Sequence, residues 1–288
     1  MTTVDRVAVI GAGTMGHGIA YVALASGRRV ALVDADAGTL SAGVARIRAS
    51  FDKGIERGKV TGEQRDGALA RLETPDELGV AVRDADLVVE AVPERLELKR
   101  QIFTAIERHA SRAAILASNT SSLSITAIAE ALEQPERVIG MHFFNPVPVM
   151  RLVELVRGVA TSDEIVERCR EFARSLGKTP IVVRDSPGFA TSRLGVVLGL
   201  EAIRMLEQGV ASAEDIDSAM ELGYNHPMGP LKLTDVVGLD VRLAIAEHLH
   251  STLRDDTYRP PALLRSLVSE GKLGKKTGQG FYRWESER

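Results

Sequence analysis

The sequence of 288 residues contains one cysteine, Cys169, and few aromatic residues, which make up 4% of the chain. A single thiol excludes a disulfide framework and a cysteine-based zinc site, and we expect no metal centre. Because Cys169 falls in a helix-like stretch, we expect a small buried thiol rather than a nucleophile. The scarcity of aromatic side chains means that the core must be aliphatic, as in most parallel sheets covered by helices.

Strong net charge and long apolar runs are also missing. The formal net charge is −3, which gives no electrostatic reason to expect a nucleic acid or an anionic membrane as a partner. No apolar run approaches the roughly 18 residues of a membrane span, and no signal peptide precedes the first apolar segment. We therefore expect a cytoplasmic protein.

What the chain does contain is a glycine-rich segment near its start, between an apolar run and a helix-like stretch. A G-x-G-x-x-G string alone is weak evidence, but here Asp34 follows at the end of a second apolar run and completes the dinucleotide-binding fingerprint. Gly11 permits a tight turn, Gly13 lets the backbone approach a pyrophosphate, and Gly16 lets the helix pack closely on the strand. The sequence predicts a dinucleotide bound by Gly11, Ala12, Gly13, Thr14, Met15 and Gly16.

Asp34 also indicates which dinucleotide is bound. A carboxylate at the tip of the second strand accepts hydrogen bonds from the adenosine ribose hydroxyls and repels a 2′-phosphate. The residues that follow are Ala35, Asp36 and Ala37, and none of them could neutralise such a phosphate. We therefore predict NAD rather than NADP.

Strand-like and helix-like runs alternate along the first two thirds of the chain, which predicts a Rossmann-type α/β fold with a doubly wound, mainly parallel sheet. Two charged helical stretches, at 39–59 and 63–72, predict a helical hairpin inserted after Asp34. Further strands are expected at 86–92, 114–117, 138–142, 151–156 and 180–183, with helices at 94–109, 125–132 and 162–176 between most of them.

Strand signals stop after Pro187-Gly188. Helical patterns at 189–208, 212–222, 231–253 and 262–269 follow, broken by glycine and proline. We therefore expect an NAD-binding Rossmann domain over residues 1–187 and an all-helical domain over 188–288.

Polar residues follow two of the expected strands at their carboxyl ends, where ligands of open α/β sheets bind. These are 118–122, Ser-Asn-Thr-Ser-Ser, and 142–148, His-Phe-Phe-Asn-Pro-Val-Pro. The serines could simply cap a helix and His142 could be structural. However, Glu154 lies inside an apolar strand, and a buried carboxylate needs a partner. A His142–Glu154 pair would be either a general base with its orienting acid or a purely structural pair, and the pattern leaves both open.

These segments together resemble the short-chain L-3-hydroxyacyl-CoA dehydrogenases, bacterial 3-hydroxybutyryl-CoA dehydrogenases above all. The motifs concerned lie at 11–16, 88–91, 118–122, 142–148, 225–230 (Asn-His-Pro-Met-Gly-Pro) and 274–282 (Gly-Lys-Lys-Thr-Gly-Gln-Gly-Phe-Tyr), so the resemblance covers essentially the whole chain. It implies NAD-dependent oxidation of an (S)-3-hydroxyacyl-CoA to the 3-ketoacyl-CoA, and the reverse, by a homodimer formed through the helical domain.

The resemblance also implies roles for individual residues. The general base falls on His142, its acidic partner on Glu154, and the serine between the acyl group and the nicotinamide on Ser121. The CoA contacts of the hairpin match Ser50 and Arg57. Contacts to NAD fall on the glycine loop, Asp34, Glu94, Lys99 and Lys276, with Asn119 and Asn145 nearby.

One position departs from the family. The helical domain usually begins Pro-Gly-Phe-x-x-Asn-Arg, with the Asn amide reaching the substrate, and this chain has Ser192 there. The shorter side chain puts that contact, and with it the acyl preference, in question. Two other functions stay open at this point: a dehydrogenase of free hydroxy acids, of the L-gulonate type, and a non-catalytic NAD-binding or structural relative. A serine hydrolase is disfavoured, because no G-x-S-x-G motif occurs.

Overall fold

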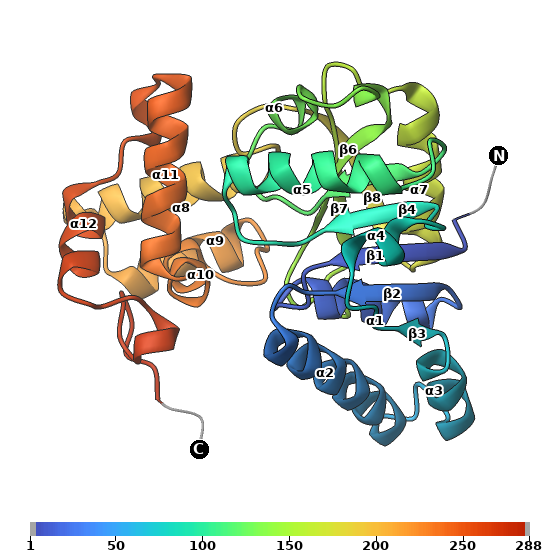
Figure 1. Cartoon of the computed structure of the whole chain (residues 1–288). Helices are drawn as coiled ribbons and strands as arrows, with labels where there is room; N and C mark the ends of the chain where they lie inside the picture. Colours follow the sequence, from blue (N-terminus) through green and yellow to red (C-terminus); the bar gives the residue numbers. More distant parts are fainter. Residues whose placement is uncertain (1–3, 286–288) are drawn as a thin grey trace. The chain divides into compact units, whose positions relative to one another are not determined.

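The computed structural model describes residues 4–285 and divides the chain into two compact units, Met1–Ser186 and Pro187–Arg288, shown by chain colour in Figure 1. The division falls one residue before the boundary expected from the sequence. Residues 1–3 and 286–288, which the expected domain limits include, lie outside the described part. Each unit has a hydrophobic core of its own.

The first unit is built on an eight-stranded sheet with the order β3-β2-β1-β4-β5-β6-β7-β8. Every neighbouring pair is parallel except β6–β7, which confirms the predicted mainly parallel, Rossmann-type sheet. The strand order reverses between β1 and β4, and this switch point is where open α/β sheets bind ligands. The strands are β1 Arg6–Ile10, β2 Arg29–Val33, β3 Leu72–Glu73, β4 Leu87–Glu90, β5 Ile115–Ser118, β6 Val138–Phe143, β7 Leu152–Arg157 and β8 Thr179–Arg184.

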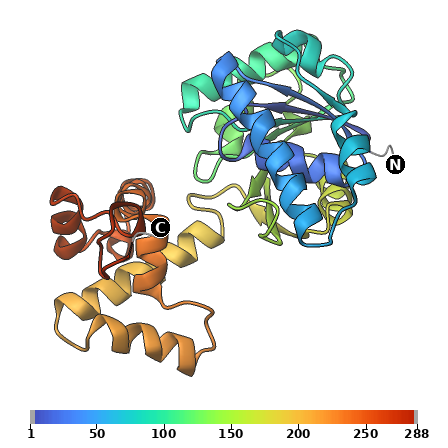
Figure 2. The ribbon, with the colours of Figure 1, turned by 90° about the horizontal axis from the view of Figure 1, so that it is seen from below.

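Helices cover both faces of this sheet, as Figure 2 shows. They are α1 Gly16–Ala25, α2 Ala37–Glu56, α3 Gly62–Leu69, α4 Leu78–Val82, α5 Leu96–His109, α6 Ile125–Ala129 and α7 Asp163–Ser175, with a 3₁₀ turn, η1, at Pro135–Arg137.

The inserted hairpin is formed by α2 and α3. The side chain of Asp36 caps α2 by accepting the amide of Thr39, and Thr61 caps α3 in a reciprocal box with Gln64. The expected second helix of the hairpin was too long, because α3 ends at Leu69. The next residues form β3, an edge strand of two residues that pairs with β2. Strand β3 and helix α4 have no periodic pattern long enough to be read from the sequence.

The core of the first unit is aliphatic, as the composition predicts, with the aromatic rings of Phe51, Phe103 and Phe143 among its few large members. Cys169 on α7 lies within this core and is 1% exposed. Burial raises the pKa of the Cys169 thiol to about 12, against the opposing charge of Arg168, so the thiol stays protonated at neutral pH. This confirms a packing role for the only cysteine.

The second unit is helical, with α8 Thr191–Glu207, α9 Ala213–Gly223, α10 Pro230–Val237, α11 Leu239–Leu253 and α12 Ala262–Ser269, and with 3₁₀ turns η2 at Asp256–Tyr258 and η3 at Lys275–Thr277. The prediction of one helix over 231–253 was wrong. Gly238 has φ of +102° and ends α10 before α11 begins. A left-handed residue cannot continue a helix, so the apolar periodicity carries across the break while the backbone does not. No helix among residues 4–285 has both the length and the apolar character needed to cross a membrane.

Candidate active site

The glycine loop connects β1 to α1 at the switch point of the sheet. Gly11 has φ of +100°, and a Cβ there would lie 2.8 Å from the carbonyl oxygen of Ala91. A Cβ on Gly16 would lie 1.7 Å from the carbonyl oxygen of Gly11, so no side chain fits. A Cβ on Gly13 would meet nothing within 4 Å. Gly13 therefore keeps space open above the loop, while the other two glycines allow its tight geometry.

A cavity of 680 Å³ adjoins this loop at the carboxyl ends of β1, β2 and β4. Gly11, Gly13, Met15, Asp34 and Val92 contribute to its walls. The Asp34 carboxylate accepts hydrogen bonds from the amide of Ala12 at 2.7 Å and from that of Asp36 at 3.0 Å, which fixes it at the tip of β2. The open space over Gly13, the helix N-terminus beyond it and this placed carboxylate fit the adenosine and pyrophosphate parts of a dinucleotide.

His142 and Glu154 form a buried pair on β6 and β7. The two residues stand directly opposite each other in the antiparallel register, with Nδ1 of His142 2.8 Å from Oε2 of Glu154. Glu154 is fully buried and His142 is 7% exposed, with the ring of Phe144 4.3 Å from the imidazole centroid. Because an ionised carboxylate only accepts, Nδ1 carries the hydrogen and Nε2 is the basic nitrogen of the neutral ring. The pair therefore has the chemistry of a general base held by an acid.

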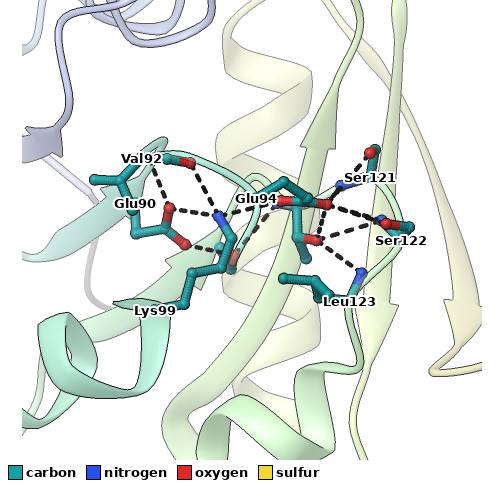
Figure 3. A network of polar contacts seen from close by, with 9 residues as sticks. Glu90, Val92, Glu94, Lys99, Ser121, Ser122 and Leu123 are labelled. Carbon is teal, nitrogen blue, oxygen red and sulfur yellow. Dashed lines mark hydrogen bonds and ion pairs between the residues drawn. The ribbon is translucent and has the colours of Figure 1, made fainter. Parts of the chain in front are cut away.

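Ser121 lies in the loop after β5, where Glu94 accepts hydrogen bonds from three residues (Figure 3). Oε1 of Glu94 accepts from the hydroxyl of Thr120 at 2.5 Å, from the amide and hydroxyl of Ser121 at 3.0 and 3.3 Å, and from the amide and hydroxyl of Ser122 at 3.2 Å each. One carboxylate oxygen therefore determines the shape of this loop, residues 119–124, which we call the serine loop.

Lys99 connects Glu94 to a second carboxylate. Its Nζ lies 2.6 Å from Oε1 of Glu90 and 3.4 Å from Oε2 of Glu94. Burial alone would raise the pKa of Glu94, but the Lys99 charge and the hydrogen bonds from Thr120 and Ser121 together outweigh it and lower that pKa. Glu94 therefore stays ionised, which suits an acceptor of several hydrogen bonds.

Asn119 ties the serine loop to the strand that carries the base. Its Oδ1 accepts the amide of Phe143 at 2.9 Å, one residue after His142. The ends of β5 and β6 are thereby held together. Ser121 follows the end of β5, and His142 lies in the last two residues of β6. Asn145, the other asparagine expected near the cofactor, is exposed in the segment after β6.

The two expected CoA contacts lie on α2 or at its end. Ser50 is half-buried, and its hydroxyl donates to the carbonyl of Arg46 in the same helix at 2.8 Å. Arg57 is exposed at the C-cap. The other basic residues of this segment, Arg46, Arg48, Lys53 and Lys59, are exposed as well, alongside the acidic Asp52 and Glu56.

Ser192 and Lys276 belong to the second unit. Ser192 is half-buried in the first turn of α8. Lys276 is exposed in η3, and its Nζ lies 2.5 Å from Oδ1 and 2.7 Å from Oδ2 of Asp240. The expected group of site residues thus divides between the units, and the base, serine loop and glycine loop all lie in the first.

Three polar residues of this network, Glu90, Ser118 and Thr120, lie within motifs seen in the sequence but were given no role of their own. Glu90 and Ser118 are fully buried and Thr120 is 1% exposed. The hydroxyl of Ser118 donates to Oε2 of Glu90 at 2.7 Å. The signal that singled out Glu154, a carboxylate within an apolar strand, is also present at Glu90, which is the last residue of the apolar strand β4.

The glycine loop, the cavity beside it and the His142–Glu154 pair agree with the family that comparison with known proteins identifies. The model of the 3-hydroxyacyl-CoA dehydrogenase NAD binding domain matches residues 6–186, and the model of the C-terminal domain matches residues 188–284. The chain belongs to the 3-hydroxyacyl-CoA dehydrogenase family. The resemblance that the motifs indicate is therefore confirmed over nearly the full length.

Individual members of the family are similar throughout. The chain is 45% identical to a probable 3-hydroxybutyryl-CoA dehydrogenase of Bacillus subtilis over 99% of both proteins. It is 46% identical to the 3-hydroxybutyryl-CoA dehydrogenase of Bradyrhizobium diazoefficiens, over 97% of this chain and 95% of the relative. The crystal structure of (S)-3-hydroxybutyryl-CoA dehydrogenase from Ralstonia eutropha superposes with a TM-score of 0.95 at 43% identity, covering 99% of this chain and all of that one.

Proposed function

We propose that this member of the family oxidises (S)-3-hydroxyacyl-CoA to 3-ketoacyl-CoA with NAD, catalyses the reverse reaction, and takes short acyl chains such as 3-hydroxybutyryl. The observation that carries the proposal is the buried His142–Glu154 pair at the carboxyl edge of a sheet whose switch point fits a dinucleotide. A structural or non-catalytic relative has no need of a buried imidazole held by a buried carboxylate.

His142 is the base in this proposal. Nε2 takes the proton of the 3-hydroxyl group, and the Glu154 carboxylate holds the ring by its Nδ1–H and stabilises the imidazolium that forms. The hydroxyl of Ser121 donates a hydrogen bond to the oxygen at C3 as it becomes a carbonyl. NAD, when bound, accepts the hydride from C3.

The cofactor is held by the glycine loop and by Asp34 in this proposal. Val92 and Met15 form apolar walls of the cavity beside the glycine loop, and Asp34 accepts hydrogen bonds from the ribose hydroxyls. Glu94, Lys99, Asn119 and Asn145 lie toward the nicotinamide, with Lys276 as a further contact from the helical unit. NAD is preferred over NADP because the carboxylate of Asp34 repels a 2′-phosphate.

Membership of the family also supports a proposal for the substrate contacts and the assembly. Ser50 and Arg57 contact CoA from the hairpin, where the exposed basic residues suit its phosphates. Ser192 faces the acyl group in place of the usual asparagine. The helical unit forms a homodimer, and exposed apolar residues of that unit, Leu194, Leu222 and Tyr224 among them, provide surface for such an interface.

Steady-state kinetics test the proposal. Acetoacetyl-CoA with NADH is compared with longer and dicarboxylic 3-ketoacyl-CoAs, and in the other direction (S)-3-hydroxybutyryl-CoA with NAD is compared with L-gulonate. The expected result is turnover of the CoA thioesters, greatest for the short chain, and none of the free acid. Oxidation of L-gulonate without activity on any CoA thioester would overturn the proposal.

A further inference from the structure

Glu90 is a carboxylate that none of the proposed steps uses, although it is fully buried at the carboxyl end of β4. Its side chain has a complete set of partners. Oε1 accepts from the amide of Val92 at 2.7 Å and from Nζ of Lys99 at 2.6 Å, and Oε2 accepts from the hydroxyl of Ser118 at 2.7 Å. A buried carboxylate with three donors has a defined position, and it can fix the position of whatever it binds.

Lys99 is the residue that Glu90 fixes. The ammonium is 1% exposed and lies between two carboxylates of unequal distance, 2.6 Å from Glu90 and 3.4 Å from Glu94. It also donates to the carbonyl of Val92 at 3.3 Å. Because attraction between charges grows as they approach, the nearer and more buried partner determines where the ammonium stays. Glu90 therefore holds Lys99 back from Glu94.

The position of Lys99 affects Ser121, because the single carboxylate of Glu94 contacts both Lys99 and the serine loop. Its Oε2 faces Lys99, while its Oε1 accepts from Thr120, Ser121 and Ser122 (Figure 3). If Lys99 moved closer, it would draw the carboxylate toward itself and away from the serine loop. The position of the Ser121 hydroxyl thus depends on Glu90, through Lys99 and Glu94.

We propose that Glu90 is a positioning residue for the dehydrogenase reaction, which sets the place of the Ser121 hydroxyl by holding Lys99 at a distance from Glu94. The inference deepens the proposed function and rests on it, because Ser121 is the group that contacts the reacting oxygen there. Glu90 itself touches neither substrate nor cofactor in this proposal.

The test is a double-mutant cycle between Glu90→Gln and Ser121→Ala. Gln keeps the size of Glu, and its Oε1 can still accept from Val92. The change removes the charge and places an NH2 donor where Oε2 accepts the hydroxyl of Ser118. We expect Glu90→Gln to lower kcat for acetoacetyl-CoA reduction by about 10- to 100-fold, the size of effect that a displaced reacting group produces. In the Ser121→Ala background, where no hydroxyl is left to position, Glu90→Gln should lower kcat by less than about twofold.

A control comes from α5, the helix that carries Lys99. Glu107 also lies on α5, is 14% exposed, pairs with Arg137 at 3.4 Å, and accepts the amides of Glu133 and Gln134. Glu107→Gln therefore removes a largely buried, paired charge from α5 without touching the serine loop. It should lower the thermal midpoint, as Glu90→Gln does, and leave kcat within about twofold of wild type.

The outcomes separate the inference from the function on which it rests. Wild type that fails to reduce acetoacetyl-CoA would overturn the proposed function itself. Active wild type in which the effects of Glu90→Gln and Ser121→Ala multiply would show that Glu90 acts by another route and would overturn the inference alone. An equal loss of kcat in Glu107→Gln would assign the effect to stability and would overturn it as well.

Discussion

The Nδ1 atom of His142 lies 2.8 Å from Oε2 of Glu154, directly across the single antiparallel strand pair of the sheet. Both side chains are buried, so neither would be placed there without a partner. This relationship is the basis of the first two predictions.

Replacing His142 with Gln should lower kcat for both directions of the reaction by about 10²- to 10⁴-fold, the usual contribution of a general base. Binding of NAD should be unchanged, because the glycine loop and its cavity lie at other strands. Stopped-flow or steady-state rates, with NADH fluorescence titration for binding, measure both quantities. A loss of less than tenfold would make His142 a structural residue.

Glu154→Gln should lower kcat by about 10- to 1000-fold, since the amide can still contact Nδ1 but cannot stabilise an imidazolium by charge. The effect should nearly vanish in the His142→Gln background, as it does for residues that act as one unit. If the two losses multiplied instead, the carboxylate would serve the fold rather than the base.

Asp34→Ala combined with Ala35→Arg should weaken the binding of NAD and allow NADP to bind. The change removes the carboxylate that repels a 2′-phosphate and supplies a guanidinium to bind it. The ratio of kcat/KM for NADPH to that for NADH measures the switch. Asp34→Ala alone is the control, because it removes the carboxylate without adding a partner for the 2′-phosphate. A wild type that already preferred NADP would contradict the assignment of Asp34.

Thr120→Val should move the acid limit of activity to higher pH. Thr120 donates to Glu94 at 2.5 Å, and its loss removes one of the contacts that lower the pKa of Glu94 against the opposing effect of burial. A carboxyl group whose pKa is lowered by folding stabilises the folded loop above its unfolded pKa and loses that effect as pH falls through the folded pKa. The variant should therefore lose activity and thermal stability earlier on acidification than wild type.

The control for this pH prediction is Thr120→Ser, which keeps the hydroxyl. Profiles of kcat/KM and of the thermal midpoint between neutral and acid pH should coincide with those of wild type. Identical acid limits in the Val variant would show that Glu94 does not govern the loop's response to acid.

Ser192→Asn should change kcat/KM for acetoacetyl-CoA by about tenfold or less, because a water bridge from the shorter serine can replace a direct contact. A profile across acyl groups for both variants distinguishes this from a different substrate preference. A gain on acetoacetyl-CoA with a loss of more than a hundredfold on another acyl-CoA would show that Ser192 makes room for that acyl group. A large loss on every substrate would make Ser192 a packing position.

Much of the fold could be predicted because its signals are local. The glycine loop, Asp34 and the alternating runs lie within short segments whose periodicity and turn residues are visible in the sequence. Glu154 could be paired with His142 because a carboxylate inside an apolar strand requires a partner, and neighbouring strands offered few.

What escaped prediction depends on contacts between segments far apart in the sequence. Glu90 is a carboxylate in an apolar strand, as Glu154 is, but its partner Lys99 lies on a helix, where a lysine usually faces solvent. The break at Gly238 was hidden because apolar residues keep their spacing on both sides of it. Strand β3 has only two residues, and it is a strand because those residues pair with β2.

The reversal of direction between β6 and β7 has a consequence for how the molecule assembles. Neighbouring parallel strands must be joined by a long crossover, whereas an antiparallel pair is closed by a short connection. His142 and Glu154 are only 12 residues apart along the chain. The chain entropy lost in bringing them together is therefore smaller than that of joining β1 to β4. We expect the base and its acid to meet at a lower entropic cost than the parallel strands β1 and β4, which form the nucleotide-binding switch point.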